Sequence, residues 1–300
     1  QQASVGTAQG IYGDRKKVSV ESSTAGFVAV DQLRPPTFRT FDLGGGVDGM
    51  TRMEEIWAGA VPGASELARD ADNVWTDPAV TEAHAHTGMA YDYFYKRFGR
   101  SGLDGRDSPI NIVVNALTQQ DAVDLVPRDY WGRWVTNASW CGSCFSGQGQ
   151  IWFGSGFPSG YHYRGWYTTY TAAALDIAVH ELTHGVTSNT SRLIYRNESG
   201  ALNEAFSDMM GISAEFFYQP RGSGLREADY IIGKDAWRPV PGRGGQGGIR
   251  SMENPRFYGD PDHYSGLYRG PSDGGGVHSN SGIPNQAFYL AIEGGRNRTS

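Results

Sequence analysis

The strongest constraint on the fold of this chain is the stretch His180-Glu181-Leu182-Thr183-His184. In an α-helix, residues four positions apart lie on one face, one turn apart, so the two imidazoles can bind the same metal ion. Glu181 is turned about 100° from His180 and can lie beside the metal without binding it. This pattern is typical of zinc hydrolases in which the glutamate is the general base. The stretch therefore predicts a helix that carries a metal site.

A second helical pattern, at Ala201–Tyr218, carries carboxylates on one face. If the two helices pack antiparallel, as their short connection indicates, His184 lies opposite Glu204 and His180 lies opposite Asp208. Glu204 then completes a His-His-Glu zinc site that leaves the fourth position for water. Asp208 can accept the other ring N–H of His180 and thereby fix its tautomer.

The same helix pairing brings further polar groups together. Asn203 can accept the ring N–H of His184, and Gly211 allows the two helices to approach closely. Asp176 and Glu215 form a second acidic pair about 10 Å or more from the zinc, given the helical rise. Buried carboxylates that lie so close must hold a cation or a proton, and oxygen ligands suit calcium. The alternative, two amphipathic helices with solvated charges, does not explain why the charges of both helices fall on the facing sides.

Several longer segments make the pattern specific. Tyr195–Asp208 and Asp273–Gly282 resemble two motifs of the thermolysin family of secreted zinc endopeptidases. Arg250–Met252 and Tyr258–Tyr264 match further family motifs, and Asn137–Trp140 resembles the family's substrate-binding edge strand. The resemblance covers nearly the whole chain.

The resemblance implies an α+β fold of two domains. A β-rich N-terminal domain is expected over residues 1–170 and a mainly α-helical catalytic domain over residues 171–300, with the zinc site in the cleft between them. Local patterns predict strands at Val18–Val20, Gly26–Val30 and Ile110–Asn115, and a helix at Ala79–Phe98. They also predict a glycine-rich turn at Asp42–Asp48, further turns at Asn197–Gly200 and over 239–248, and a mixture of strands and turns over 131–157.

The resemblance also implies the catalytic roles. Glu181 takes a proton from the zinc-bound water as the water attacks a peptide carbonyl, and then delivers it to the leaving nitrogen. Tyr195 and His278 stabilise the negative charge that develops on the carbonyl oxygen, and Asp273 orients His278. Contacts with the substrate are implied for Asn137, Ala138, Arg250, Ile177, Ile232 and Ile249. The isoleucines match pocket-lining positions of the family, and an apolar pocket favours an apolar side chain, so the resemblance implies cleavage on the N-terminal side of bulky hydrophobic residues.

At a further metal site the chain departs from the family. Asp176, Glu215 and Asp229 match carboxylate ligands of the family's two-ion calcium cluster, whereas Ile231 and Lys234 stand where acids are usual. The carbonyl of Ile231 can still bind a cation, and the ammonium group of Lys234 can take the place of one ion. We therefore expect one structural calcium ion here, or none.

The only cysteines, Cys141 and Cys144, directly follow the expected substrate-binding edge strand. A zinc ribbon needs a second pair, and a thioredoxin-like role needs a βαβ context. The sequence meets neither requirement. A small-loop disulfide in an oxidising compartment is therefore favoured, and it would stiffen the edge strand. The family does not usually carry cysteines at these positions.

Composition limits the partners and the location. The net charge of −6 and the pI near 5.6 argue against a nucleic-acid partner. No apolar run reaches membrane-spanning length, and no signal peptide begins at Gln1. The chain is therefore expected to be soluble, and to be a mature form if it is secreted. The resemblance implies a secreted, extracellular enzyme that is released from a zymogen, acts on polypeptides and is a monomer.

The end of the chain carries a further expectation. Ser281–Gly294 is predicted to be a helix, with Pro284 near its first turn. Its apolar residues fall on more than one side, whereas a terminal surface helix should show one apolar stripe. The resemblance implies more helices after this point. We therefore expect Ser300 to be a cleavage point or an artificial boundary, and a cleaved C-terminal segment to stay bound.

Two other functions stay open from the sequence alone. A catalytically dead binding protein could retain this fold, although the intact set of zinc ligands, base and donors speaks against it. An exopeptidase needs charged groups that hold a substrate terminus, and the sequence identifies none. A peptidase assay on a casein-like substrate separates the first possibility from an active endopeptidase.

Overall fold

The computed structural model describes residues 2–163, 165–222, 224, 226–240, 242 and 246–299. The chain forms two compact units, Gln1–Ala173 and Ala174–Ser300. Part of the loop predicted at 239–248, and Ser300 itself, lie outside the described residues.

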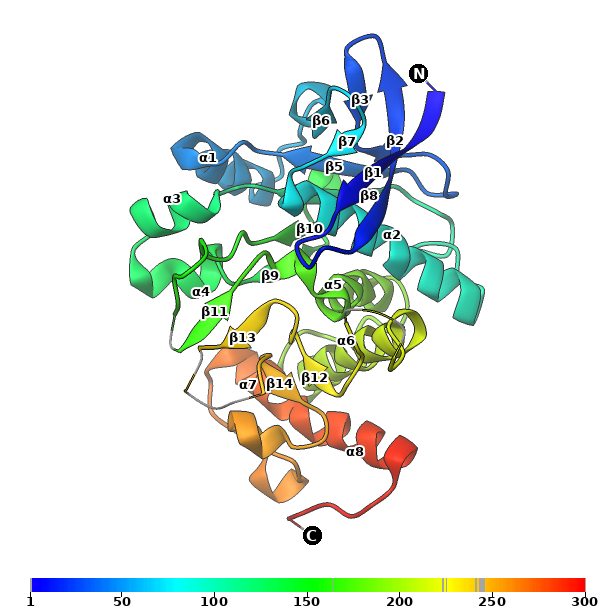
Figure 1. Ribbon diagram of the computed structural model, residues 1–300. Helices are drawn as coiled ribbons and strands as arrows, with labels where there is room; N and C mark the ends of the chain where they lie inside the picture. Colours follow the sequence, from blue (N-terminus) through cyan, green and yellow to red (C-terminus); the bar gives the residue numbers. More distant parts are fainter. Residues whose placement is uncertain are drawn as a thin grey trace. The chain divides into compact units, whose positions relative to one another are not determined.

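The first unit contains two five-stranded sheets (Figure 1). One has the strand order β6-β3-β2-β1-β7, with β1 at Gln2–Gln9, β2 at Arg15–Ser23, β3 at Gly26–Val28, β6 at Arg69–Asp70 and β7 at Val74–Trp75. Strands β1 and β2 form a long antiparallel hairpin. In β2 the buried Val18 and Val20 alternate with less buried Lys17 and Ser19, because successive side chains of a strand point to opposite faces.

The second sheet has the order β4-β5-β8-β10-β9. Its strands are β4 at Val30–Asp31, β5 at Phe38–Asp42, β8 at Ile110–Val114, β9 at Ala138–Cys141 and β10 at Gln150–Phe153. The central strand β8 is buried at every position and pairs in parallel with β5 and β10, as expected for a sheet covered on both faces. The edge strand β9 runs antiparallel to β10.

Helix α2, Pro78–Phe98, forms where the sequence predicts a helix. The Asp77 side chain accepts hydrogen bonds from the first free N–H groups of the helix, and Gly99, at φ 63°, ends it. Its two histidines have structural partners. The ring of His84 bonds to Thr40 and to a backbone carbonyl of β2, and the ring of His86 bonds to Lys16 and to the carbonyl of Ala172.

Two helices of this unit differ from the sequence-based expectation. Helix α1, Gly46–Trp57, begins inside the predicted turn Asp42–Asp48 and buries Met53 and Ile56 on one face. The expected region of strands and turns over 131–157 contains the short helix α4, Trp131–Trp134, whose two tryptophans join the hydrophobic core. The remaining short elements are η1 at Ala64–Glu66, α3 at Gln119–Asp124, η2 at Arg128–Tyr130, η3 at Phe145–Gly147, β11 at Trp166–Thr168 and η4 at Thr171–Ala173.

The predicted disulfide is present. It joins Cys141, the last residue of β9, to Cys144 in the following loop, with a Cα–Cα distance of 5.5 Å.

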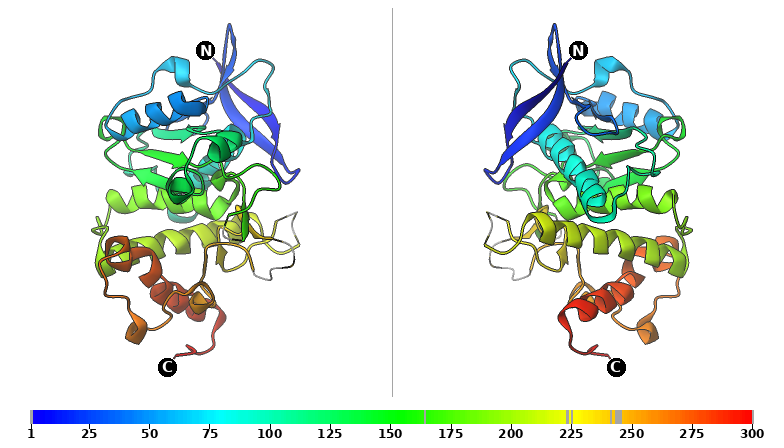
Figure 2. Two further views of the ribbon diagram at one scale, coloured as in Figure 1. Left: turned by 90° about the vertical axis from the view of Figure 1, so that its left-hand side faces the viewer. Right: turned by 90° about the vertical axis from the view of Figure 1, so that its right-hand side faces the viewer.

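The second unit is mainly helical. Helix α6, Asn197–Tyr218, lies between α5, Leu175–Ser188, on one side and the pair α7, Asp273–Asn280, and α8, Gly282–Glu293, on the other (Figure 2). The turn predicted at Asn197–Gly200 is wrong, because these residues form the first turn of α6. The other elements are β12 at Ile231–Ile232, β13 at Trp237–Pro239, β14 at Arg250–Ser251, η5 at Pro255–Tyr258 and η6 at Tyr264–Gly266.

Helix α8 forms close to its predicted bounds, and its apolar side chains are only partly covered. Ala287 and Ala291 are exposed, and Ile292 keeps 55 % of its surface exposed. Within the described ranges, no helix combines the length and apolarity that crossing a bilayer requires.

Candidate metal centre

The site is built on α5 and α6, which run side by side in the second unit (Figure 2). Their close approach depends on Gly211, because a Cβ atom at this position would lie 2.6 Å from the backbone oxygen of Asp176. The absence of a side chain in mid-helix, unfavourable for the isolated helix, therefore lets the polar faces of the two helices meet.

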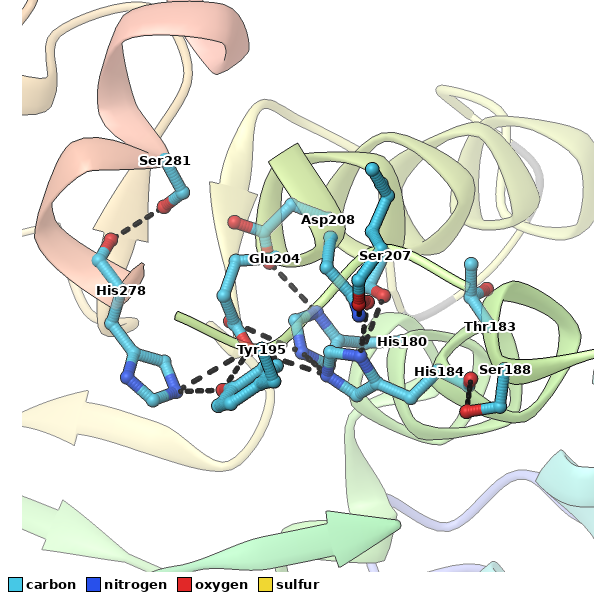
Figure 3. A network of polar contacts seen from close by, with 12 residues as sticks. His180, Thr183, His184, Ser188, Tyr195, Glu204, Ser207, Asp208, His278 and Ser281 are labelled. Carbon is cyan, nitrogen blue, oxygen red and sulfur yellow. Dashed lines mark hydrogen bonds and ion pairs between the residues drawn. The ribbon is translucent and has the colours of Figure 1, made fainter. Parts of the chain in front are cut away.

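Three buried side chains converge between these helices (Figure 3). Ligand atoms of His180, His184 and Glu204 all lie within 4.8 Å of one another. The two Nε2 atoms are 2.9 Å apart, and oxygens of the Glu204 carboxylate lie 3.5 Å and 3.3 Å from them. Across the described part of the chain, this is the one group of histidine, cysteine or acidic side chains found close enough together to hold a metal ion.

The other nitrogen of each histidine is engaged by a hydrogen-bond partner. Nδ1 of His180 lies 2.8 Å from Oδ1 of Asp208, and Nδ1 of His184 lies 2.8 Å from Oδ1 of Asn203. Both oxygens are acceptors, so each imidazole carries its proton on Nδ1 and turns the lone pair of Nε2 toward the other ring.

This arrangement fits a metal ion. Two nitrogen lone pairs that face each other at 2.9 Å repel unless a proton or a cation lies near both. In addition, Oε2 of Glu204 is buried and accepts no hydrogen bond from the described residues. Two imidazoles and one carboxylate are the ligand set of catalytic zinc sites that keep an open position.

A second layer of contacts holds Asp208 in place. Arg250 donates Nε to Oδ2 at 2.8 Å and Nη2 to Oδ1 at 2.6 Å, and Asn285 donates to Oδ2 at 2.8 Å. Burial alone would raise the pKa of Asp208, but the charge of Arg250 and the contact with His180 lower it to about 2. Asp208 is therefore an anion that can hold the His180 ring in one tautomer.

Two groups of this cluster have strongly shifted pKa values. Burial would raise the pKa of Glu204, but the charges of the surrounding histidines hold it well below its ordinary value. Burial would lower the pKa of His184, but its contact with Glu204 raises it to about 9. The cluster thus attracts positive charge, either as protons or as a cation.

Tyr195 and His278 reach the same site from outside α5 (Figure 3). The Tyr195 hydroxyl donates to Glu204 and lies 3.1 Å from Nε2 of His278. Nδ1 of His278 lies 2.6 Å from Oδ1 of Asp273, whose Oδ2 also accepts from the His278 backbone N–H. The buried carboxylate of Glu181 is outside the three-residue cluster.

Comparison with known proteins places the chain in a family. Residues 5–188 match the model of the catalytic domain of thermolysin metallopeptidases, and residues 191–300 match the model of their alpha-helical domain. The chain belongs to the thermolysin family of metallopeptidases. The expected family fold is therefore confirmed, with a sheet-rich first part and a helical second part.

The chain is similar to several members of the thermolysin family. It is 37 % identical over 294 residues to a bacillolysin of Bacillus cereus, covering 97 % of this chain and 43 % of the relative. It is 36 % identical over 298 residues to a thermolysin of Alicyclobacillus acidocaldarius subsp. acidocaldarius, covering 98 % and 45 %. The chain thus spans less than half the length of these curated relatives. Among solved structures, the precursor of protealysin, a metalloproteinase from Serratia proteamaculans, matches with a TM-score of 0.59 and 29 % identity, covering 91 % of this chain and 70 % of that one.

The residues that resemble the thermolysin family's calcium ligands have protein partners. Asp176 accepts hydrogen bonds from the backbone N–H groups of Ile177 at 2.8 Å and Gly233 at 2.6 Å. Asp229 is paired with the ammonium group of Lys234, which also donates to the carbonyl of Glu227 at 3.0 Å.

The buried carboxylates of this region still attract a cation or a proton. Burial raises the pKa of Asp176 to about 7. Burial and the charge of Asp176 raise the pKa of Glu215 well above its ordinary value. Asp235, which is absent from the sequence-based site, is also buried and adds to this charge. The Lys234–Asp229 pair already engages one of the carboxylates that resemble the family's calcium ligands.

The predicted substrate contacts lie in both units. In the first unit, Ala138 begins the edge strand β9, and the exposed Asn137 directly precedes it. In the second unit Ile177 and Ile232 are buried, and the backbone of the half-buried Ile249 is bonded to Ile232. Arg250 is 8 % exposed and is bonded to Asp208, a contact that the sequence pattern does not predict.

Proposed function

We propose that this protein is a secreted zinc-dependent endopeptidase that cleaves peptide bonds on the N-terminal side of bulky hydrophobic residues. One observation carries the proposal: the Nε2 lone pairs of His180 and His184 and the carboxylate of Glu204 converge on one point. Membership of the thermolysin metallopeptidase family gives this cluster a chemical context.

His180, His184 and Glu204 would hold the zinc ion. When bound, zinc acts as a Lewis acid and lowers the pKa of a coordinated water to about 7. Asp208 and Asn203 keep the Nδ1 protons of the two histidines in place, so that both Nε2 atoms stay available as ligands.

The other polar side chains of the site transfer protons and stabilise negative charge. Glu181, one residue after the first ligand, accepts the proton of the attacking water and passes it to the leaving nitrogen. The Tyr195 hydroxyl and Nε2 of His278, which lie 3.1 Å apart, donate to the oxygen that becomes negative. Asp273 supports this role because its hydrogen bond orients the imidazole of His278.

The specificity follows from apolar residues. A pocket lined by Ile177, Ile232 and Ile249 favours an apolar side chain after the scissile bond, since burying one contributes about 1.5–3 kcal/mol. Asn137, Ala138 and Arg250 would hold the substrate backbone.

We also propose that at most one structural calcium ion binds in the second unit, through Asp176, Glu215, Asp229 and the carbonyl of Ile231. The buried, mutually repelling carboxylates support a cation at this position. The Lys234–Asp229 pair supports the loss of a second one.

We place the protein outside the cell as a monomer released from a zymogen. Its catalytic domain would extend from residue 171 and its β-rich domain over residues 1–170.

Metal analysis and cleavage-site profiling on a denatured protein test the proposal together. About one zinc per molecule and cleavage before Leu, Phe or Ile are expected. Zinc binding without any hydrolysis would instead identify a binding protein that retains the fold, and a profile dominated by charged residues after the scissile bond would refute the proposed pocket.

A further inference from the structure

The free edge of β9 ends at the disulfide. Within the described part of the chain, β9 is the outermost strand of its sheet and pairs with β10 alone. Cys141 is its last residue and opposes Gln150 of β10, and the disulfide ties Cys141 to Cys144 in the loop between the two strands.

The pairing pattern determines which backbone groups face this free edge. Neighbouring residues of an antiparallel strand turn their N–H and C=O groups alternately toward and away from the partner strand. The carbonyl of Asn137 accepts a hydrogen bond from the N–H of Gly154 at 2.9 Å, so Asn137, Ser139 and Cys141 turn toward β10. Ala138 and Trp140 therefore offer their N–H and C=O groups at the free edge.

The loop after β9 contains two residues in an unfavourable backbone conformation. Phe145 and Ser146 both have a φ of 53°, in the left-handed region that non-glycine residues rarely adopt. Turn hydrogen bonds such as that from the N–H of Gly149 to the carbonyl of Cys144, at 3.0 Å, hold this loop together with two side-chain contacts. Phe145 is buried, with its ring 5.3 Å from that of Phe41, and the fully buried Cys144 is bonded to Cys141.

Trp140 is in contact with both ends of the same loop. A Cβ atom at Gly149 would lie 2.3 Å from the Trp140 indole, and one at Gly142 would lie 3.3 Å from it. A change in the loop therefore reaches Trp140 through its side chain, and reaches its backbone through the adjoining Cys141.

We propose that the Cys141–Cys144 disulfide is a positioning element for substrate binding, which fixes the outward N–H and C=O groups of Trp140 for pairing with an extended polypeptide. Pairing of this kind adds a strand to a free sheet edge through backbone hydrogen bonds. The inference rests on the proposed endopeptidase function. It predicts that the disulfide affects the binding of peptides long enough to reach Trp140, and not the chemical step.

The test uses the variant Cys141→Ala/Cys144→Ala and two quenched peptides with the same cleavage site. One peptide is short, and the other is extended by four residues at each end, so that it can pair with β9 on either side of the cleavage site. The KM for the long peptide should rise about three- to tenfold, as expected for the loss of roughly one hydrogen bond. The kcat for both peptides and the KM for the short one should stay within twofold of wild type.

Met53→Ala is the matched control. Met53 is fully buried in the core cluster that also contains Cys144, so its truncation lowers stability without changing the disulfide. Its ratio of long-peptide to short-peptide KM should equal that of the wild type. If the double variant does not fold, Cys141→Ser opens the bridge at its more exposed end and gives the same comparison.

The outcomes separate the two proposals. An unchanged KM ratio in a folded variant, with an active wild type, overturns the role of the disulfide and leaves the endopeptidase assignment standing. A zinc-loaded wild type that cleaves neither peptide overturns that assignment, and this inference with it.

Discussion

At the scale of single residues, different side chains of the candidate metal centre are proposed to bind the ion and to carry out the reaction. His180 and His184 are held by acceptors on their Nδ1 atoms, whereas Glu181 lies outside the converging cluster. A change at Glu181 should therefore act on the reaction and leave the metal in place.

Glu181→Gln tests this separation. The variant should bind zinc like the wild type, and kcat/KM should fall by at least about 10²–10⁴-fold, the usual contribution of a general base. Zinc content by elemental analysis and hydrolysis of a quenched peptide are measured on the same sample. Retention of more than about a tenth of wild-type kcat/KM would exclude Glu181 as the base.

Lys234 permits a second test at this scale. Its ammonium group is paired with Asp229 and acts to lower the raised pKa of Glu215. In Lys234→Glu a carboxylate replaces this internal cation, so the variant should bind one more calcium ion than the wild type and become more stable as calcium is added. At a calcium concentration of 100 Kd the expected gain is about 2.7 kcal/mol.

The control is Lys17→Glu, the same charge reversal at an exposed position of β2. Calorimetric titration counts the ions, and thermal unfolding reports stability. Two ions bound to the wild type, or an equal count in both proteins, would contradict the proposed role of Lys234.

At the scale of the elements, Gly211 determines how closely α5 and α6 can pack. A Cβ atom there would lie 2.6 Å from the Asp176 oxygen, a distance that only a shift of the backbone can relieve. Gly211→Ala should therefore lower the free energy of unfolding by about 1–3 kcal/mol, as overpacking does. It should also weaken zinc binding, because the ligands come from both helices.

Gly132→Ala is the matched control, since a Cβ atom at Gly132 in α4 meets nothing within 4 Å. Alanine has the higher helix propensity, so this variant should be as stable as the wild type or slightly more so. Chemical denaturation and zinc titration of both variants provide the comparison. Equal zinc affinity in the two would show that the helices adjust without moving the site.

The same helices show which parts of the structure the sequence predicts. His180, His184 and Glu204 lie on strongly periodic helices joined by a short connection, so local spacing is enough to bring them together. Helix α1 is missed because Gly44, Gly45 and Gly46 have φ values of 73°, 75° and 68° and look like a turn that continues. The bonds from Arg250 and Asn285 to Asp208 span 42 and 77 residues, and no local pattern contains such contacts.

At the scale of the whole molecule, all the proposed zinc ligands belong to the unit Ala174–Ser300. An ion that binds the folded protein and not the unfolded chain stabilises the fold by mass action, by about 4.1 kcal/mol at 1,000 Kd. Removal of zinc with a chelator should therefore lower the melting temperature and abolish hydrolysis, and added zinc should restore both.

Calorimetry resolves where this stabilisation acts. If the two units melt in separate transitions, zinc should shift only the transition of the second, so that the first serves as an internal reference. Glu181→Gln should show the full shift while remaining inactive, because Glu181 is not a ligand. His184→Ala should lose most of the shift, because it removes one ligand and leaves the buried carboxylate of Glu204 without that partner. Identical melting of the wild type with and without zinc would mean that the converging side chains do not hold the ion, whatever the activity.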